Sequence, residues 1–351
     1  MNLNDFQQFS SIDTLDMIGH INGLPDQLSA AWDLGKKQPL PNFTGIQNVL
    51  IAGMGGSAIG ADILSAYIAP LCPVPVVVLR DYNLPGWAKG AHTLVIASSH
   101  SGNTEETLSA YEQAINNGCQ VLVISTGGKL AAAGKAAGVP VWIFNHTATP
   151  RSAVGFSFGL LLAAFVRLGL IPDQEEAVKE AVLAMRDQQK TIRAEVEIGK
   201  NPAKRLAGQL VGRFVAVLGS DYLAPIARRW KGQISEIGKA WAQFEQLPEA
   251  DHNTLAGLVN PEETLSRLAV IFLRAPSDHS QNQLRSRLTS EIMMREGVNT
   301  DYYEAKGSVP LSHIWTTLNF GDYVAYYLAM AYEVDPSPVD AIESLKVAMK
   351  K

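Results

Sequence analysis

Two short segments of the sequence combine glycines and hydroxyl side chains where a buried strand is expected to give way to a helix. The first is GMGGS (residues 53–57), after the apolar residues 49–52, and the second is SSHSGNT (residues 98–104), before Glu105 and Glu106. Hydroxyl donors and helix N-terminal amides together can bind a phosphate without a lysine. We therefore predict that an anionic group is held by Gly55, Gly56, Ser57, Ser99, Ser101 and Thr104.

Each segment also has another interpretation. GMGGS is close to the G-x-G-x-x-G turn of dinucleotide-binding proteins, and Asp81 after the next apolar run could bind a ribose. The third glycine of that pattern comes only at Gly60, so the match is imperfect. In the second segment, Thr104 followed by two acids is a good helix N-cap. Capping accounts for one hydroxyl but not for four, so the sequence favours phosphate binding.

The elements expected to position these segments alternate between apolar runs and helical stretches. Runs without polar alternation lie at residues 49–52, 74–79, 93–99, 121–126 and 139–144. Strands covered on both faces have this pattern, which is typical of a parallel sheet. Helical stretches between the runs imply right-handed crossovers and helices on both faces. The sequence therefore predicts an α/β fold with a doubly wound parallel sheet.

A second series of strands begins at FVAVLGS (residues 214–220), which again ends in Gly-Ser and runs into a helix. Apolar residues around 268–275 and 298–303 continue this series, which suggests a duplicated doubly wound domain with fewer glycines. The expected segments are a helical lead-in at 1–44, a first sheet domain at 45–171, a helical connector at 172–205, a second sheet domain at 206–333 and a C-terminal helix at 334–351.

The composition excludes several classes of protein. The 351 residues carry a net charge of -5, which provides no basic face for nucleic acid or an anionic membrane. The N-terminus is acidic and lacks the apolar core of a signal peptide. The longest apolar run, residues 153–166, is shorter than the roughly 20 residues that a membrane span needs. We therefore expect a cytoplasmic protein without a nucleic-acid or membrane partner.

The residues that ligate metals show no metal-binding pattern. The seven histidines form no H-x-H or H-x3-H pair and no acidic triplet accompanies them, and Cys72 and Cys119 are too far apart for a zinc pattern. The sequence also has no nucleophile elbow of the serine hydrolases. We therefore predict chemistry that uses neither a metal nor a cofactor.

The two glycine and hydroxyl loops together resemble those of the sugar isomerase (SIS) domain family. Four further motifs narrow the resemblance to the bifunctional phosphoglucose/phosphomannose isomerases. These motifs are TPRSAVG (149–155), RWKGQISEIGKA (229–240), EADHNTLAG (249–257) and the segment from GDY to DPSPVDAIESLK (321–346). The resemblance implies two SIS-type, flavodoxin-like domains. It also implies aldose–ketose isomerisation of glucose 6-phosphate, and of mannose 6-phosphate, to fructose 6-phosphate through a cis-enediolate.

The same resemblance assigns roles to individual residues. The two loops would bind the substrate phosphate, and Arg151 would steady the enediolate. Glu236 would be the base, and His252 and Lys346 would open the sugar ring. The family works as a two-fold dimer with its site near the subunit interface, so His252 could act in the neighbouring subunit. His100 departs from the family, because a tyrosine often occupies this position of the loop.

Without the resemblance, these residues have ordinary interpretations. We expect Glu236 on a helix whose core stripe includes Trp230, Ile234, Ile237, Trp241 and Phe244. At helical spacing Glu236 points away from this stripe, so it could be a plain surface acid. His252 lies in a loop and could be a turn residue. Lys346 could be a surface lysine beside Glu343. Arg151 stands at the start of an apolar helix, where a cation is unfavourable and a nearby anion would relieve it.

Two other functions compete with the isomerase. A non-catalytic sugar-phosphate-binding regulator with the same domain type would use the same loops. Such regulators usually carry a basic helix-turn-helix reader, which the acidic N-terminal 45 residues do not support. The isomerase half of an amidotransferase would need an N-terminal cysteine nucleophile and a glutaminase domain, which the sequence lacks.

Overall fold

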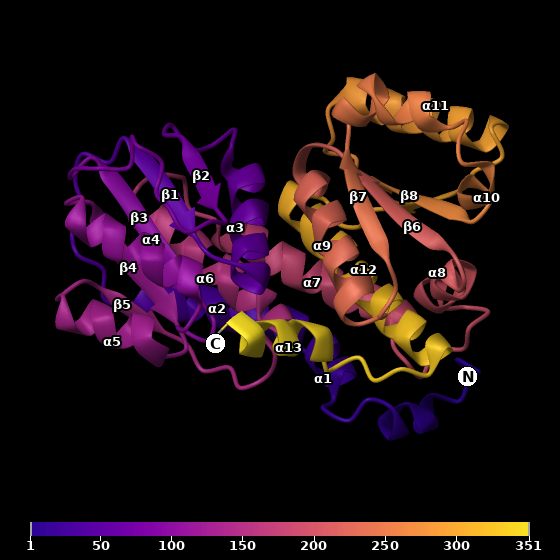
Figure 1. The fold of residues 1–351 in the computed structure, drawn as a ribbon, viewed down its shortest axis with the longest axis horizontal. Helices are drawn as coiled ribbons and strands as arrows, with labels where there is room; N and C mark the ends of the chain where they lie inside the picture. The colour runs from indigo at the N-terminus through magenta and orange to yellow at the C-terminus, as the bar shows by residue number, and fades with distance from the viewer. Residues whose placement is uncertain (1, 350–351) are drawn as a thin grey trace. The chain divides into compact units, whose positions relative to one another are not determined.

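The computed structural model describes residues 2–349 and contains two parallel β-sheets among many helices (Figure 1). The chain divides into two compact units. The first unit comprises residues 24–183 and 309–312. The second unit comprises the other described residues, namely 2–23, 184–308 and 313–349. No helix among the described residues is both long and apolar enough to cross a membrane.

The first unit is built on a five-stranded parallel sheet of order β2-β1-β3-β4-β5. Every residue of β3 is buried, as the unbroken apolar run predicts. Its strands are β1 (Asn48–Ala52), β2 (Val76–Leu79), β3 (Thr93–Ser99), β4 (Gln120–Ser125) and β5 (Val141–Ile143). Its helices are α2 (Leu24–Lys37), α3 (Gly55–Ile68), α4 (Glu105–Asn116), α5 (Gly128–Ala136) and α6 (Val154–Arg167), with the 3₁₀ turn η2 (Pro150–Ser152).

The second unit is built on a four-stranded parallel sheet of order β7-β6-β8-β9. Its strands are β6 (Phe214–Gly219), β7 (Ala242–Gln246), β8 (Leu268–Arg274) and β9 (Asn299–Glu304). Its longer helices are α8 (Pro202–Leu210), α9 (Ala224–Glu236), α11 (Ser280–Arg295) and α13 (Asp340–Met349). Its short elements are η1 (Phe6–Ser11), α1 (Met17–Asn22), η3 (Asp221–Leu223), η4 (Glu249–His252), η5 (Thr254–Gly257) and α10 (Glu262–Leu265).

Two helices cross the division between the units. The boundary falls inside α7 (Glu175–Ile192) and within the first turn of α12 (Pro310–Tyr332). Residues 1–44, which the sequence suggests as one helical lead-in, contain α1 in the second unit and α2 in the first. The domain boundaries drawn from the sequence remain predictions.

Both sheets have the same winding. Each begins with a strand whose next two partners in the sequence pair on either side of it, β2 and β3 around β1, and β7 and β8 around β6. This arrangement creates a switch point in strand order, where doubly wound folds bind ligands at the carboxyl ends of the strands. The predicted fold class, two doubly wound parallel sheets of the flavodoxin type, is confirmed.

One predicted helix is wrong in its extent. The apolar stripe suggests a helix that continues through Trp241 to Phe244, but α9 ends at Glu236. Gly238 N–H and Ala240 N–H donate to carbonyls of the last helical turn, and Lys239 adopts a left-handed φ of 52°. Such left-handed residues terminate helices. Phe244 therefore lies on the unpredicted strand β7, and Trp241 is 76% exposed instead of belonging to the core.

Candidate active site

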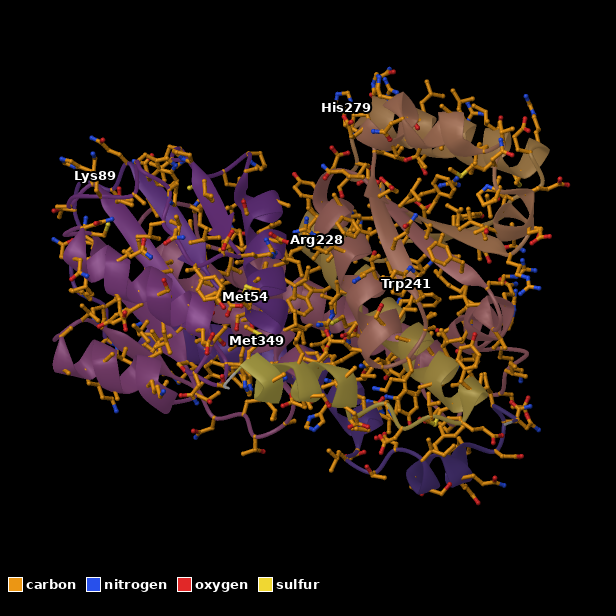
Figure 2. The ribbon with its side chains drawn as sticks, in the orientation of Figure 1. Met54, Lys89, Arg228, Trp241, His279 and Met349 are labelled. Atoms are coloured by element: carbon orange, nitrogen blue, oxygen red, sulfur yellow. The ribbon has the colours of Figure 1, made fainter. Side chains whose placement is uncertain are left out.

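The carboxyl edge of the first sheet gathers the loops that the sequence singled out. Met54, labelled in Figure 2, follows β1 and precedes α3, and Gly55 takes a left-handed φ of 51°. Gly56 lies against η2, since a Cβ atom there would be 2.4 Å from the carbonyl oxygen of Pro150. A side chain at Gly56 would therefore push the first turn of α3 away from the segment that carries Arg151.

The hydroxyl groups of the two loops are joined by short hydrogen bonds. The Oγ of Ser99 and the Oγ1 of Thr104 lie 2.9 Å apart, and Gly102 N–H donates to Ser99 Oγ at 3.1 Å. His100 N–H donates to Ser57 Oγ at 3.2 Å and thereby connects the loop after β3 with the loop after β1. Three of the predicted phosphate-binding residues, Ser57, Ser99 and Thr104, thus belong to one hydrogen-bonded set, and Gly56 precedes Ser57 in the chain.

The capping interpretation of Thr104 does not account for its hydroxyl group. Thr104 precedes the first residue of α4, but within the described part of the chain its side chain makes no capping hydrogen bond. The hydroxyl instead faces Ser99 inside the loop. Ser101 Oγ accepts a hydrogen bond from Asn103 N–H at 3.2 Å and is exposed at the loop tip. The loop therefore presents hydroxyl groups beside the positive end of α4, as an anion site requires.

A third loop, residues 126–127 between β4 and α5, supports this arrangement and was missed in the sequence. Thr126 donates to the carbonyl oxygen of His100 from both its N–H, at 3.1 Å, and its Oγ1, at 2.7 Å. A Cβ on Gly102 would lie 1.9 Å from the carbonyl oxygen of Gly127, so the two loops touch through backbone. The adjacent glycines 127 and 128 after an apolar run were the signal that could have revealed this loop.

Arg151 lies in the same unit as the two glycine and hydroxyl loops. It belongs to η2 and only 5% of it is exposed. Gln27 fixes the segment, because its side chain donates to the carbonyl oxygen of Ser152 at 2.8 Å and accepts from Gly155 N–H at 2.7 Å. Arg151 is thus held in a fixed, buried segment directly ahead of α6.

Glu236, the predicted base, is the last residue of α9 and is half-buried. A carboxylate at a helix C-terminus faces the negative end of the helix dipole, which is not a placement that stability favours. Lys239 lies close by, where its Nζ donates to the carbonyl oxygens of Glu236 and Pro338. This lysine ties the chain ahead of α13 to the end of α9.

His252 is the last residue of η4, which follows β7, and it is exposed. Its neighbour Asp251 accepts hydrogen bonds from Arg285 Nη1 at 3.0 Å and from Thr289 Oγ1 at 2.7 Å. Both partners belong to α11, so η4 is fixed to that helix. The backbone that carries His252 is therefore held in place while its imidazole faces solvent.

Lys346 lies on α13, none of whose described residues is buried. Its Nζ donates to Glu343 Oε1 at 2.8 Å, and both side chains are about 60% exposed. This is the pair that the ordinary interpretation of a surface lysine predicts. The contacts of α13 do not distinguish that interpretation from a role in ring opening.

Glu236 and His252 lie at opposite edges of the second sheet. Helix α9 starts beside the carboxyl end of β6 and ends before the amino end of β7, whereas η4 follows the carboxyl end of β7. The five-residue strand β7 alone spans roughly 16 Å. Within one chain, the structure therefore does not bring these two predicted catalytic residues together.

The carboxyl edge of the second sheet carries acidic side chains. Asp278, which follows β8, is only 7% exposed and accepts a hydrogen bond from Ala275 N–H at 2.9 Å. Burial raises the pKa of Asp278 to about 7, and the nearby carboxylates of Asp221 and Glu304 add to this rise. The negative charge of Asp221 and Glu304 makes this edge less suited to an anion than the carboxyl edge of the first sheet.

The unusual pKa of Asp278 predicts a pH-dependent stability. The folded protein keeps this proton up to about pH 7, whereas the unfolded chain releases it near pH 4, so the free energy of unfolding falls as pH rises between these values. Asp278→Asn should remove this dependence and stabilise the protein at pH 8 by about 1–3 kcal/mol. Denaturant titrations at pH 5 and pH 8 measure the free energy of unfolding of both proteins. Glu262→Gln is the control, since Glu262 is an exposed acid of the same unit. A variant that loses as much stability as the native protein over this range would contradict the assignment.

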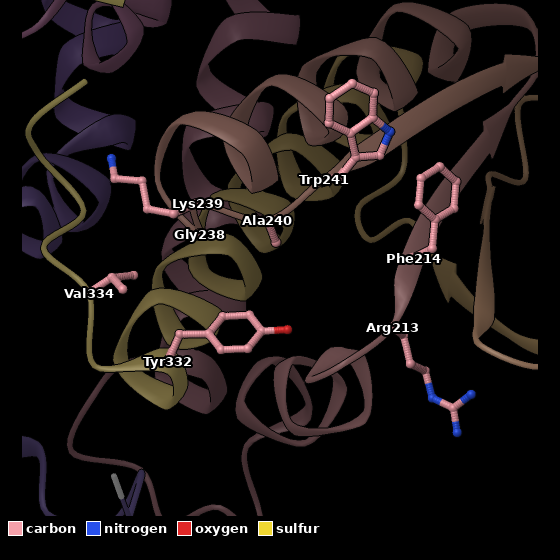
Figure 3. A pocket seen from close by; sticks show the side chains of 8 residues that line it. All are labelled: Arg213, Phe214, Gly238, Lys239, Ala240, Trp241, Tyr332 and Val334. Atoms are coloured by element: carbon pink, nitrogen blue, oxygen red, sulfur yellow. The ribbon is translucent and has the colours of Figure 1, made fainter. Parts of the chain in front are cut away.

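The second unit also has a hollow of about 420 Å³ (Figure 3). It lies near the amino ends of β6 and β7, where Phe214 opens β6 and Trp241 precedes β7. The lining residues are Arg213, Phe214, Gly238, Lys239, Ala240, Trp241, Tyr332 and Val334. None of the residues predicted to bind phosphate or to catalyse lines this hollow.

Two doubly wound parallel sheets, with loops rich in glycine and hydroxyl side chains at one carboxyl edge, are the architecture of the sugar-isomerase-domain class. Residues 199–349 match the sequence model of the bacterial phospho-glucose isomerase C-terminal SIS domain. The bifunctional phosphoglucose/phosphomannose isomerase of Caldicellulosiruptor bescii is 38% identical over 94% of this chain and 98% of its own length. The chain belongs to the family of bifunctional phosphoglucose/phosphomannose isomerases.

A second relative agrees with this assignment, and a solved structure agrees with the fold. The enzyme of the same name from Aquifex aeolicus is 32% identical over 88% of this chain and 92% of its own length. The crystal structure of a glucose-6-phosphate isomerase like protein from Thermus thermophilus superposes with a TM-score of 0.63 at 19% identity, covering 98% of both chains. At that identity the structural likeness supports the fold.

Proposed function

We propose that the protein interconverts glucose 6-phosphate, and mannose 6-phosphate, with fructose 6-phosphate. The observation that carries the proposal is the connected set of hydroxyl and glycine loops at the carboxyl edge of the first sheet, in the same unit as the buried Arg151. Membership in a family whose relatives carry this activity in their names supports the substrate and the reaction. The protein is therefore proposed to be an enzyme and not a regulator.

The proposed reaction moves one proton between neighbouring carbons. The loop hydroxyls and the amides at the start of α3 and α4 bind the phosphate and fix the sugar. His252 and Lys346 transfer protons during opening of the ring, which exposes the C1 aldehyde. Glu236 then takes the proton from C2, so that a cis-enediolate forms as the carbonyl π electrons move to O1. Glu236 returns the proton to C1 while the hydroxyl proton of O2 passes to O1, which leaves the carbonyl at C2. Arg151 lowers the energy of the negatively charged intermediate.

A two-fold dimer would supply His252 to the site of the neighbouring subunit. The separation of Glu236 from His252 across β7 supports this arrangement, because a second copy can present its own His252 where the first copy cannot. Cyclic dimers are the commonest oligomers, and their interfaces contain the same surface from both subunits. The proposed assembly is therefore a homodimer with two equivalent sites.

Turnover by the purified protein tests the function. EDTA-treated protein is incubated with glucose 6-phosphate or with mannose 6-phosphate, and the formation of fructose 6-phosphate is followed. We expect turnover of both aldoses, and their relative rates give the preference for the configuration at C2. Binding of the sugar phosphates without turnover would instead support a non-catalytic regulator.

The phosphate loops predict a selective effect on substrate binding. Ser57→Ala combined with Thr104→Ala should raise KM, because each lost hydrogen bond to a charged group costs about 1–3 kcal/mol. Steady-state kinetics with fructose 6-phosphate measure the effect. Ser65→Ala is the matched control, since Ser65 lies on the same helix α3, further from its N-terminus. An unchanged KM in the double variant would show that these loops hold something other than the substrate phosphate.

A further inference from the structure

His100 joins the loops of the phosphate site, although its side chain is not among the predicted ligands. It stands between Ser99 and Ser101 in the loop after β3. Its N–H donates to Ser57 of the loop after β1, and its carbonyl oxygen accepts from Thr126 of the loop after β4. The backbone of one residue thus links the loops that follow three adjacent strands.

The ring of His100 extends this link to the chain after β5. Its Nε2 and the Nδ1 of His146 lie 2.9 Å apart, which is the distance of a hydrogen bond between two imidazoles. His146 belongs to the segment 144–149, which leads directly into η2 and Arg151. The ring contact therefore connects the loop with the phosphate-binding hydroxyls to the segment with the buried arginine.

Aromatic rings hold the two histidines in this geometry. His100 meets Phe144 edge-on with ring centroids 5.9 Å apart, and His146 meets Phe156 edge-on at 6.0 Å. Phe144 and Phe156 stack on each other at 5.0 Å. Burial lowers the pKa of His100, which favours the neutral ring at neutral pH. A neutral His100 ring can share one hydrogen with His146 through an N–H···N bond.

We propose that His100 and His146 are positioning residues that set the distance between the phosphate site and Arg151. This inference rests on the proposed isomerase function and deepens it. The phosphate determines where the sugar begins, and Arg151 must meet the negative charge that develops at the other end of the same molecule. Small errors in such distances are costly, because displacement by about 1 Å can reduce rates about 100-fold.

The test removes the ring contact and then restores it. His146→Ala should lower kcat by about 5–10-fold, the effect of one lost hydrogen bond, while KM for fructose 6-phosphate changes less than about twofold. His146→Asn should recover most of kcat, because an asparagine amide can present a nitrogen or oxygen near the position of Nδ1. His100→Gln offers the corresponding replacement for Nε2. His92→Ala is the control, since His92 precedes β3 at the opposite edge and its ring is hydrogen-bonded to the carbonyl oxygen of Gly45.

The outcomes separate this proposal from the function on which it rests. A native protein without turnover would overturn the isomerase function itself. With an active native protein, equal kcat in the native, alanine and asparagine forms would overturn the positioning role, as would a loss that asparagine does not restore. A lower melting temperature with unchanged kcat would show that the pair only stabilises the fold. A double variant, His100→Ala with His146→Ala, should cost no more than either alone, as expected for two groups that act as one unit.

Discussion

Glu236→Gln is expected to slow isomerisation, with kcat reduced by about 100- to 10,000-fold, the usual contribution of a general base. Glutamine has nearly the same shape as glutamate but cannot take the C2 proton. Exchange of that proton with deuterated solvent should stop together with turnover. The phosphate loops lie on other elements, so affinity for fructose 6-phosphate should be retained.

A second measurement separates the base from the residues that open the ring. Ring opening interconverts the α and β anomers of glucose 6-phosphate without breaking a C–H bond, and exchange NMR can follow it. Glu236→Gln should retain catalysed anomerisation, whereas His252→Ala should lose it along with isomerisation. Glu263→Gln serves as control, since Glu263 is an exposed acid of the same unit and should behave like the native protein. Continued C2 exchange in Glu236→Gln would remove Glu236 from the mechanism.

Two inactive variants are expected to produce an active protein when they share a dimer. In a heterodimer of Glu236→Gln and His252→Ala, one site receives both defects and the other receives neither, provided that His252 acts in the neighbouring subunit. The variants are co-expressed with different affinity tags and purified by both tags. The heterodimer should then have about half the native activity, because one of its two equivalent sites is intact.

The same experiment contradicts the arrangement if His252 acts within its own chain. Each site of the heterodimer would then contain one defect, and activity would stay at the level of the two variants alone. Failure to isolate a species with both tags would contradict the dimer. A heterodimer of Glu263→Gln with His252→Ala is the matched control. It measures the activity of a dimer in which one site lacks His252 and the other site is intact.

Local patterns in the sequence determined much of the fold. The unbroken apolar run before Ser99 predicts a strand buried on both faces, and β3 is completely buried. Glycines and hydroxyls at 53–57 and 98–104 likewise mark strand tips, because turns and helix starts have residue preferences that act over a few positions. These features depend on residues that are adjacent in the chain, so the sequence is enough to predict them.

The tertiary structure alone decided what depends on distant residues. Apolar spacing carried the predicted helix past Glu236 to Phe244, but the chain turns at Lys239 and Phe244 pairs in β7. The contact between His100 and His146 joins residues 46 positions apart. The spacing of apolar residues reveals the period of a helix or strand. Burial and hydrogen bonding also depend on segments that are distant in the sequence, and the spacing holds no information about them. For this reason the residue types of the site could be anticipated, whereas the separation of Glu236 from His252 by a strand required the folded chain.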